Sequence, residues 1–270
     1  MQKLSDIHGG KHMLKNTVQI IAAACLVALC AVGYANAQDV SLRVGITPDS
    51  PPLIFKQNGK ITGVEADLAR RLGEELKRPV EFVELRWDRQ IAALLEGRID
   101  IIMSGMTITE ARKVRINFTD PYLKSGLVAA IRAEDSAKYN SAKSILSGYQ
   151  AVGVIKGTTG EAFVQKNMSN STSIATLSKV RDAASELQTR RIDVFIHDAP
   201  AVIWLVSENE ADLRGVWELM TEENLGWGIR KGEGDFLKQM NAILRRWKQD
   251  GTLDQTLRNW LPAKYFERVK

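Results

Sequence analysis

Cysteine and histidine are scarce in this chain of 270 residues, which holds two cysteines and three histidines. Both cysteines, Cys25 and Cys30, and two of the histidines, His8 and His12, lie within the first 37 residues. If those residues are removed on maturation, no cysteine remains and His197 is the one histidine left. The sequence therefore excludes disulfides, cysteine nucleophiles, thiolate metal sites and multi-histidine zinc sites from the mature protein. We expect neither a metal nor a cofactor.

Long apolar runs are also scarce, and the strongest one, residues 18–32, begins shortly after Lys15. Residues 35–37 then read Ala-Asn-Ala, a small-x-small site. This order is typical of a secretory signal peptide, so we expect residues 1–37 to be cleaved on export and the mature protein to start near Gln38. Because the run is shorter than the roughly 18 to 20 apolar residues that cross a bilayer, we expect no membrane anchor.

Two alternatives stay open within this segment. The polar lead before the apolar run is long for a signal peptide, which favours Met13 rather than Met1 as the true start. Cys25 or Cys30 could in principle carry a lipid. Leu29, however, is larger than the small residue usual before a lipidated cysteine, and Cys25 would leave a very short apolar core.

Charge of one sign is not in large excess. The chain has 37 basic and 32 acidic side chains, and the predicted signal peptide holds three of the lysines and one aspartate, which lowers the net charge from +5 to +3. No basic cluster alternates with aromatic residues. These features do not indicate nucleic-acid binding. The sequence also lacks internal repeats, low-complexity tracts and long linkers.

Short apolar runs alternate with amphipathic segments along the rest of the chain. Apolar residues recur every four positions from Val64 to Leu76, which predicts a helix with a capping box formed by Thr62 and Glu65, and Asp88 could cap the next helix. The pattern predicts an α/β fold with a largely parallel sheet. The expected strands are 42–46, 80–85, 99–103, 127–131, 151–155, 192–196 and 225–229, and the expected helices lie near 64–76, 88–95, 159–166, 178–189, 199–207, 236–247 and 253–260.

The α/β pattern occurs twice without a linker, so we expect two lobes joined by strands that cross between them. In open α/β sheets, ligands bind beyond the carboxyl ends of the strands. The residues that follow Ile46, Met103, Ile155 and Ile196 should therefore meet in a cleft between the lobes.

The segment after Met103 has the composition of a carboxylate site. Residues 104–112 read Ser-Gly-Met-Thr-Ile-Thr-Glu-Ala-Arg and lead from a strand end into a helix start. Free backbone N–H groups, the hydroxyl of Thr107 and the rigid donor fork of Arg112 suit the two oxygens of a carboxylate. Taken alone, Arg112 is more simply explained as a solvated arginine at a helix start.

Two further strand ends carry matching groups. Residues 156–160 read Lys-Gly-Thr-Thr-Gly and place two hydroxyls at a helix N-terminus, which suits an anion. Asp198 could face the cleft, and Pro200 fits the first turn of a helix. Each feature alone is more simply an ordinary turn or an ordinary N-cap. Together with Arg112 they describe the head of an amino acid, with a guanidinium for its carboxylate and a carboxylate for its ammonium.

At this point the chain resembles a known family, the periplasmic amino-acid-binding proteins of ABC importers. The resemblance is to the glutamine and lysine/arginine/ornithine/histidine binding type, in the bacterial extracellular solute-binding protein family 3. The resemblance covers essentially the whole mature chain and implies a two-lobed periplasmic-binding-protein fold of type II with two hinge crossings. The motifs that carry it, in order, are 42–45, 63–69, 97–100, 104–112, 118–122, 156–159 and 191–193.

The resemblance implies a role for each of these motifs. Arg112 would hold the ligand carboxylate with help from Thr107 and the backbone around Gly105. Thr158 and Thr159 would close on the same end from the second lobe. The implied ligand-binding residues are Thr47, Ser50, Trp87, Ser104, Gly105, Thr107, Arg112, Thr158, Thr159, His197 and Asp198.

The resemblance also implies how the ligand's other groups are held. Asp198 would bind the ammonium, and His197-Asp198 looks like the corresponding pair in glutamine binders. Trp87 falls where the family places an aromatic or apolar wall against the ligand side chain. Its alternative is a rim tryptophan that packs against a helix start.

The family hinge would fall near residues 122–126 and again near 223–226. Two crossings predict a discontinuous first lobe, residues 38–124 plus 225–270. The second lobe would then be residues 125–224.

The sequence departs from the family pattern where the ligand side chain would lie. Thr47 stands where the family often has an acidic residue, Ser50 where it often has an aromatic one, and Leu53 where phenylalanine is common. Burying a basic head without a carboxylate is costly, so we expect a neutral amino acid to bind better than a basic one. Asp49 or Glu65 could supply the missing charge if the loop after β-strand 42–46 folds differently.

The function that the resemblance implies is capture of an amino acid by lobe closure and delivery to the membrane permease of an ABC transporter. We expect a monomer whose partners are the amino acid and the permease, with no nucleic acid. Two alternatives stay open, because the same fold occurs in ligand-sensing subunits of membrane receptors and in periplasmic cyclohexadienyl dehydratases. In the dehydratase alternative, Glu161 or Asp198 would act as a general acid. We expect a binding protein and not an enzyme.

Overall fold

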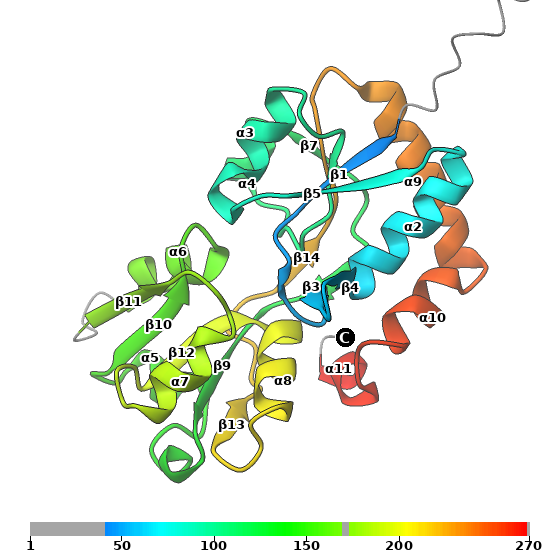
Figure 1. Cartoon of the computed structure of the whole chain (residues 1–270). Helices are drawn as coiled ribbons and strands as arrows, with labels where there is room; N and C mark the ends of the chain where they lie inside the picture. The colour runs from blue at the N-terminus through cyan, green and yellow to red at the C-terminus, as the bar shows by residue number, and fades with distance from the viewer. Residues whose placement is uncertain (1–40, 169–172, 269–270) are drawn as a thin grey trace, which may run out of the picture. The chain divides into compact units, whose positions relative to one another are not determined.

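The computed structural model describes residues 41–168 and 173–268. The predicted signal peptide, residues 1–37, lies outside the described residues. From Ser41 onward the chain forms one unit. Its strands make two five-stranded sheets and two smaller ones (Figure 1).

The first large sheet has the strand order β5-β1-β6-β15-β7. Its centre is parallel, since β1 (Leu42–Ile46) pairs in parallel with β5 (Val80–Glu84) and β6 (Ile101–Ile102). β15 (Gly228–Ile229) is antiparallel to both β6 and β7 (Asn117–Phe118). This sheet thus includes a strand from near the C-terminus between strands from the first half of the chain.

Seven helices accompany the first large sheet, and the two longest show the predicted apolar stripes. Val64, Leu68 and Leu72 on α2 have no exposed surface, and Met240 and Leu244 on α9 are equally buried. The helices are α2 (Val64–Leu76), the 3-10 helix η1 (Trp87–Arg89), α3 (Gln90–Leu95), α4 (Glu110–Lys113), α9 (Gly234–Gln249), α10 (Thr252–Arg258) and α11 (Ala263–Arg268).

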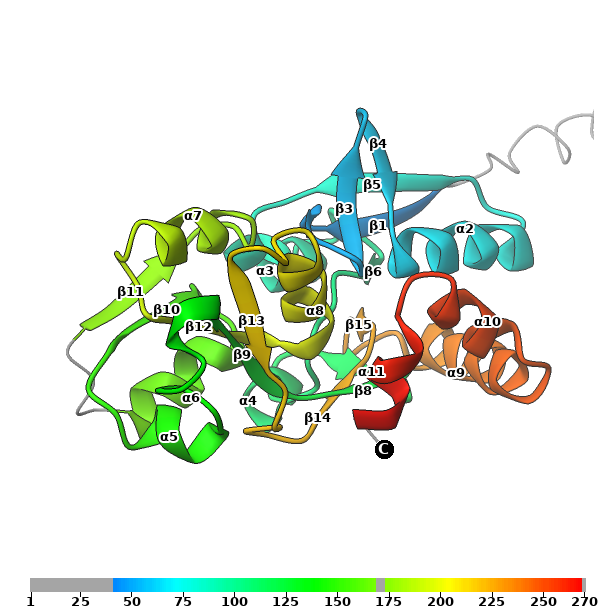
Figure 2. The same cartoon turned by 90° about the horizontal axis from the view of Figure 1, so that it is seen from below.

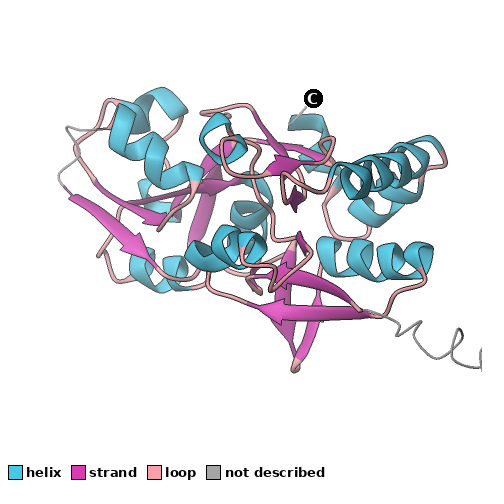
Figure 3. Ribbon diagram, turned by 90° about the horizontal axis from the view of Figure 1, so that it is seen from above, coloured by secondary structure: helices cyan, strands magenta, loops and turns pink. Residues whose placement is uncertain are grey.

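The second large sheet has the strand order β11-β10-β12-β9-β13. β10 (Ala151–Ile155) is parallel to β11 (Ser173–Leu177) and β12 (Val194–Asp198), whereas β9 (Leu127–Arg132) is antiparallel to β12 and β13 (Leu213–Val216). Figures 2 and 3 show the two large sheets as separate groups of strands, each with its own helices. The helices of this second group are the 3-10 helix η2 (Ala133–Asp135), α5 (Ala142–Leu146), α6 (Thr159–Asn167), α7 (Asp182–Gln188) and α8 (Ala199–Ser207).

Two short antiparallel strands run between these groups. β8 (Leu123–Ser125) pairs with β14 (Glu223–Leu225), with Glu223 opposite Ser125. β8 leads directly into β9 of the second sheet, and β14 leads back to β15 of the first. These are the two segments in which the sequence predicted a hinge, and the lobe boundaries at 124/125 and 224/225 remain our proposal.

A small three-stranded sheet follows β1. It consists of β2 (Asp49–Ser50), β3 (Ile54–Gln57) and β4 (Lys60–Thr62), paired antiparallel. It places the residues after Ile46 beside the start of α2, because the N–H groups of Val64 and Glu65 donate to the carbonyls of Pro52 and Leu53.

Two predicted helix caps are wrong. Gly63 is the N-cap residue of α2 and no side chain caps the helix, so Thr62 and Glu65 form no capping box. Glu65 instead accepts a bond from Gly105, 40 residues further along the chain. Asp88 lies within η1, and α3 begins after Arg89 without a side-chain cap.

Several strand ends also differ from the prediction. The strand expected at 192–196 is β12 at 194–198, so His197 and Asp198 are its last two residues rather than the first residues beyond it. The strand expected at 99–103 is limited to Ile101 and Ile102. β11 was not predicted, because it lies at the sheet edge and its sequence, Ser-Ile-Ala-Thr-Leu, mixes apolar with polar residues that are exposed or half-buried and forms no continuous apolar run.

Candidate ligand-binding site

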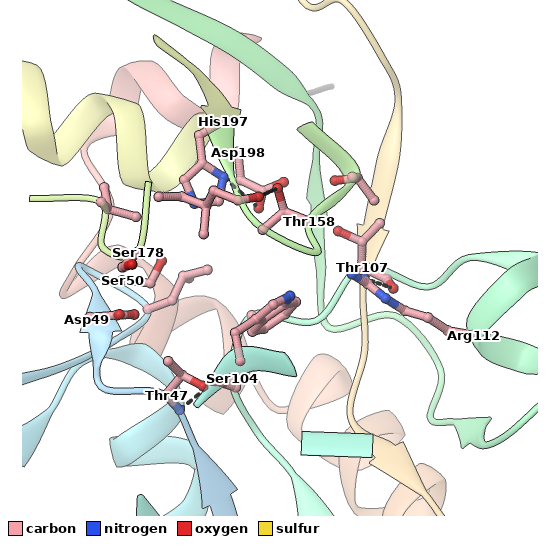
Figure 4. Close-up of a pocket in the computed structure, with 16 residues that line it drawn as sticks. Thr47, Asp49, Ser50, Ser104, Thr107, Arg112, Thr158, Ser178, His197 and Asp198 are labelled. Carbon is pink, nitrogen blue, oxygen red and sulfur yellow. Dashed lines mark hydrogen bonds and ion pairs between the residues drawn. The ribbon is translucent and has the colours of Figure 1, made fainter. Parts of the chain in front are cut away.

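One cavity is lined by residues that follow strands of both large sheets (Figure 4). Its volume is about 40 Å³, and part of the cavity is open to solvent. The structure brings all eleven sequence-predicted site residues together around this cavity. Strand ends far apart in the sequence therefore meet at one place, as the α/β pattern predicted. Five further residues line the cavity: Asp49, Leu53, Ile155, Ser178 and Val180.

The turn after β6 is fixed by Gly105 and Glu65. Gly105 has a positive φ of 66°, and a Cβ at this position would lie 2.9 Å from Leu53 Cδ1, so the turn favours glycine. The Gly105 N–H donates to Glu65 Oε2. Glu65 is fully buried, which raises the pKa of its carboxyl to about 8 against the opposing effects of Tyr122 and the Gly105 N–H. The Gly105 N–H is therefore engaged by Glu65 rather than free for a ligand.

Arg112 lies against the cavity and not in bulk solvent. Thr109 is the N-cap of α4, and its hydroxyl accepts a bond from the Arg112 N–H at 3.2 Å. The guanidinium donates to Thr107 O at 2.8 Å and to Gly157 O at 3.2 Å. Burial lowers the pKa of Arg112, although the charge of Asp198 opposes that shift. Both acceptors are neutral carbonyls, so the guanidinium keeps a positive charge that an anionic ligand can match.

Trp87 links the two groups of strands at the same carbonyl. Its Nε1 donates to Gly157 O at 3.0 Å, and its ring lies 5.4 Å from the guanidinium carbon of Arg112. That distance allows a cation–π contact. The polar edge of the indole is thus engaged, and its ring remains as a flat wall of the cavity.

Asp198 ends β12 and starts α8, with Pro200 in the first turn. Its side chain makes no cap bond, which contradicts the reading of Asp198 as an ordinary N-cap. The residue is 8% exposed, and its Oδ1 atom is buried without a hydrogen-bond donor among the described residues. Burial, and then the nearby Glu223 carboxylate, raise the pKa of Asp198 to about 8, against the opposing charge of Arg112. Asp198 therefore lacks a cationic partner strong enough to keep it ionised at neutral pH.

Glu223 is not a lining residue, but it holds two of the lining threonines, and sequence reasoning missed this role. It starts β14, and its Oε2 accepts bonds from Thr107 at 2.9 Å and Thr159 at 3.1 Å. Its Oε1 accepts a bond from Thr221 at 3.0 Å. Glu223 thus ties together a residue that follows the first sheet, a residue that follows the second, and a crossing strand. No motif marks it, and only its place in the expected hinge could have drawn attention to it.

His197 is buried beside Asp198. It is 6% exposed, and its ring packs edge-to-face against Phe195 with 5.7 Å between ring centroids. Burial lowers the pKa of His197 to about 4, so the ring is neutral at neutral pH. Its Nδ1 atom lies 3.4 Å from Asp198 Oδ2. The pair therefore acts as a neutral imidazole next to a carboxyl group.

The threonines at the start of α6 differ in what they do. The Thr158 hydroxyl donates to Ile155 O at 2.7 Å and accepts the Glu161 N–H at 3.4 Å, so Thr158 is the N-cap of the helix. Thr159 donates to Glu223 instead. Glu161 Oε2 accepts the Gly157 N–H at 2.7 Å and so serves the loop itself.

The backbone N–H and the hydroxyl of Thr47 are hydrogen-bonded within the protein. The Thr47 N–H donates to Ser104 Oγ at 2.8 Å, and its hydroxyl donates to Leu85 O at 3.0 Å while accepting from Gln90 Nε2 at 2.9 Å. Gln90 has no exposed surface. This network holds the end of β1 against the Ser104 turn and makes Thr47 a neutral wall.

Among the described residues that line the cavity, Asp49 is the acidic one near Ser50 and Ser178 (Figure 4). Its pKa is raised to about 6, mainly by burial, while the charges of Arg181 and Lys179 oppose the shift. Asp49 is therefore ionised at neutral pH but already faces two basic side chains.

The residues that the structure describes hold no group of three or more histidine, cysteine, aspartate or glutamate side chains placed to bind a metal ion. In the same residues, none of the helices has both the length and the apolar character needed to cross a membrane.

The fold and the cavity define the class of two-lobed α/β proteins that bind solutes between their lobes. The chain belongs to the bacterial extracellular solute-binding proteins, family 3, whose model matches residues 42–263. It is 29% identical over 224 residues to the L-cystine-binding protein TcyJ of Escherichia coli (strain K12), covering 83% of each chain.

Solved structures agree with this membership. A putative binding component of an ABC transporter from Wolinella succinogenes DSM 1740, complexed with lysine, has a TM-score of 0.78 and 29% identity, covering 84% of this chain and 98% of that one. The ancestral amino acid-binding protein AncCDT-1, described as a precursor of cyclohexadienyl dehydratase, has a TM-score of 0.76 and 35% identity, covering 82% and 95%. The resemblance noted in the sequence and the expected two-lobed fold are confirmed. The ligands named for these relatives are not the same, since one is L-cystine and another is lysine.

Proposed function

We propose that this protein captures an amino acid in the cavity by lobe closure and delivers it to the permease of an ABC transporter. Arg112 and Asp198 carry the proposal, because they place a guanidinium and a buried carboxyl group on the same cavity. An α-carboxylate matches the first group and an α-ammonium matches the second. The family and the ligands named for relatives support an amino acid as the solute.

The threonines and Glu223 refine the expected pose of the ligand head. The hydroxyl groups of Thr107 and Thr159 donate hydrogen bonds to Glu223, so their oxygens remain available only as acceptors. We therefore assign both oxygens to the ligand ammonium, together with Asp198, rather than to its carboxylate. The carboxylate would displace one of the carbonyl contacts of Arg112 and form a bidentate pair with the guanidinium.

Closure of the lobes is the mechanism that we infer. Gly157 O accepts bonds from both Trp87 and Arg112, and these contacts join the two groups of strands in the present conformation. A ligand that touches both groups of strands would favour this conformation over an open one, since its binding energy shifts the population between them. β8 and β14 would serve as the hinge, with lobes of residues 38–124 plus 225–270 and 125–224.

Location and partners follow from family membership and from the N-terminal pattern. Members of the family are periplasmic, and residues 1–37 have the order of a secretory signal peptide. We propose export, cleavage near Gln38, and presentation of the closed form to a membrane permease by a monomer.

A thermal-shift panel of the common amino acids and small carboxylates tests this function. A ligand present at 100 times its dissociation constant should add about 2.7 kcal/mol to the free energy of unfolding. A shift with amino acids, and none with the matching acids that lack an amino group, is the expected result. If no amino acid shifts the transition, the proposed function is wrong.

One observation favours a second candidate, a dehydratase activity. The raised pKa of Asp198 leaves its carboxyl group protonated at neutral pH, which is the state a general acid needs. Glu161, the other candidate acid, is held by the Gly157 N–H. Incubation with prephenate or arogenate, followed by absorbance of the aromatic product, decides the question. Turnover that is lost in Asp198→Asn would replace transport with catalysis.

A further inference from the structure

A second cavity adjoins the ligand-binding cavity. The two share five lining residues, Thr47, Asp49, Trp87, Ile155 and Ser178. A ligand that passes along the Trp87 ring would therefore reach from one cavity into the other. We call the second one the outer cavity.

The outer cavity is lined by more basic than acidic side chains. Two of its basic side chains are already paired, Lys56 with Glu84 at 2.7 Å and Arg86 with Asp88 at 3.0 Å. These pairs are exposed and cancel one another's charge.

The remaining charges are three basic side chains and one carboxylate. Lys156, Lys179 and Arg181 line the outer cavity, and none of them takes part in an ion pair of the described residues closer than 4.0 Å. The charges of Lys179 and Arg181 act on Asp49, the carboxylate that both cavities share. The outer cavity thus has an excess of positive charge next to one acceptor for a cation.

The outer cavity and the inner site both combine basic side chains with an acidic one. Inside, Arg112 faces Asp198 across the place assigned to an α-amino acid head. Outside, Lys179 and Arg181 face Asp49. Both ends offer positive groups for a carboxylate and a negative group for an ammonium.

We propose that the outer cavity binds the far end of the ligand and that the ligand is an extended amino acid with a second zwitterionic head. This rests on the proposed function and names its substrate class. The second carboxylate lies against Lys179, Arg181 and Lys156, and the second ammonium lies against Asp49. Such a ligand has no net charge, and its linker runs along the Trp87 ring.

Four probes of related structure separate the contributions of the far end. 2,6-Diaminopimelate has both far groups, lysine lacks the far carboxylate, 2-aminopimelate lacks the far ammonium, and norleucine lacks both. L-Cystine is a two-headed probe with a different linker. Calorimetry should show at least tenfold tighter binding of 2,6-diaminopimelate or L-cystine than of lysine and norleucine, with 2-aminopimelate between them.

Variants locate the effect in the outer cavity. The double substitution Lys179→Ala with Arg181→Ala should weaken the two-headed probes at least tenfold and leave norleucine within twofold. Arg86→Ala is the matched control, since this lining arginine is already paired with Asp88. It should change no probe by more than twofold.

The outcomes separate this inference from the proposed function. If one-headed amino acids bind as tightly as both two-headed probes, or if the double variant weakens norleucine as much as it weakens them, this inference is wrong and amino-acid capture stands. If no amino acid of either kind binds, the proposed function is wrong as well.

Discussion

Thr107 and Thr159 donate to the same oxygen, Oε2 of Glu223, at 2.9 and 3.1 Å. Thr107 comes after β6 of the first large sheet, and Thr159 is the first residue of α6 beside the second large sheet. Glu223 is the first residue of β14, which crosses between the two. One carboxylate thus joins the two groups of strands at the cavity. Because both threonine protons point to Glu223, the two hydroxyl oxygens are left as acceptors, and a cationic group of the ligand fits these two oxygens better than an anionic one.

Arg112→Ala should abolish useful ligand binding without unfolding the protein. Loss of one partner from a buried charge pair costs roughly 2 to 5 kcal/mol, which is more than tenfold in affinity. Lys113→Ala is the matched control, because Lys113 lies on the same short helix, is exposed and pairs with Glu110 at the surface. Calorimetry with the ligand found in the panel measures both. Near-wild-type affinity in a folded Arg112→Ala protein would contradict the assignment.

Asp198→Asn tests whether the ligand carries an ammonium group. Asparagine cannot ionise next to the ligand ammonium as Asp198 can, so an amino acid should bind more than tenfold more weakly, whereas a plain carboxylate should bind equally well or better. Glu223→Gln should weaken the same ligand, and Glu222→Gln, an exposed neighbour on the chain, should not. Titration calorimetry of the three variants gives the comparison. Unchanged or improved affinity in Asp198→Asn would overturn the amino-acid assignment.

Binding should release a proton near neutral pH. In the free protein the pKa of Asp198 is raised to about 8, so the carboxyl group is largely protonated at pH 7, and a bound ammonium favours its ionised form. Affinity should therefore rise as pH increases from about 6 to 8. The pKa of His197, about 4, lies outside that range. Calorimetry at pH 7 in two buffers of different ionisation enthalpy measures the proton, and Asp198→Asn should release none.

Glu65 should make the protein less stable as pH rises. Its folded-state pKa is about 8 against an ordinary 4.5, so between these values the folded state keeps a proton that the unfolded state has lost. The free energy of unfolding then falls by about 1.4 kcal/mol per pH unit for that proton. Glu65→Gln mimics the protonated form. In denaturant unfolding, its free energy of unfolding relative to wild type should therefore increase from pH 5 to pH 8.

Glu65→Ala is the control for that experiment. It leaves the Gly105 N–H without its acceptor and should destabilise the protein at every pH. A constant difference between Glu65→Gln and wild type over the same pH range would show that Glu65 is not protonated in the folded protein.

The sequence predicted the position of the cavity because its residues sit at the ends of apolar strands. Ile46 and Ile155 end strands with strong apolar patterns, and the groups after them follow from the general rule for α/β sheets. The edge strand β11 and the ends of β12 were not predictable in this way. An edge strand buries few side chains, and strand ends depend on pairing partners that lie far away in the sequence.

The roles of Glu223 and Glu65 could not be predicted from local pattern. Glu223 reaches the cavity because β14 pairs with β8, which places it opposite Ser125. Glu65 has the spacing of a capping residue, yet it turns into the protein and accepts the Gly105 N–H. Both contacts join segments that only the tertiary fold brings together.

A neutral amino acid should bind better than a basic one. Thr47 offers no charge and its hydroxyl is engaged by Leu85 and Gln90, and the fully buried Glu65 is no longer a candidate partner for a basic side chain. Asp49 remains, but Lys179 and Arg181 already act on it. Burial of a lysine or arginine head here would leave a cation among cations.

The thermal-shift panel measures this preference directly, with Asp49→Asn as the variant that tests its cause. Lysine and arginine should give smaller shifts than neutral amino acids in the wild type, and Asp49→Asn should reduce them further. If lysine or arginine gives the largest shift while neutral amino acids stay near baseline, the prediction is wrong. Loss of that shift in Asp49→Asn would then identify Asp49 as the carboxylate that binds the basic head, because Asp49 is the acidic residue on that side among the described lining residues.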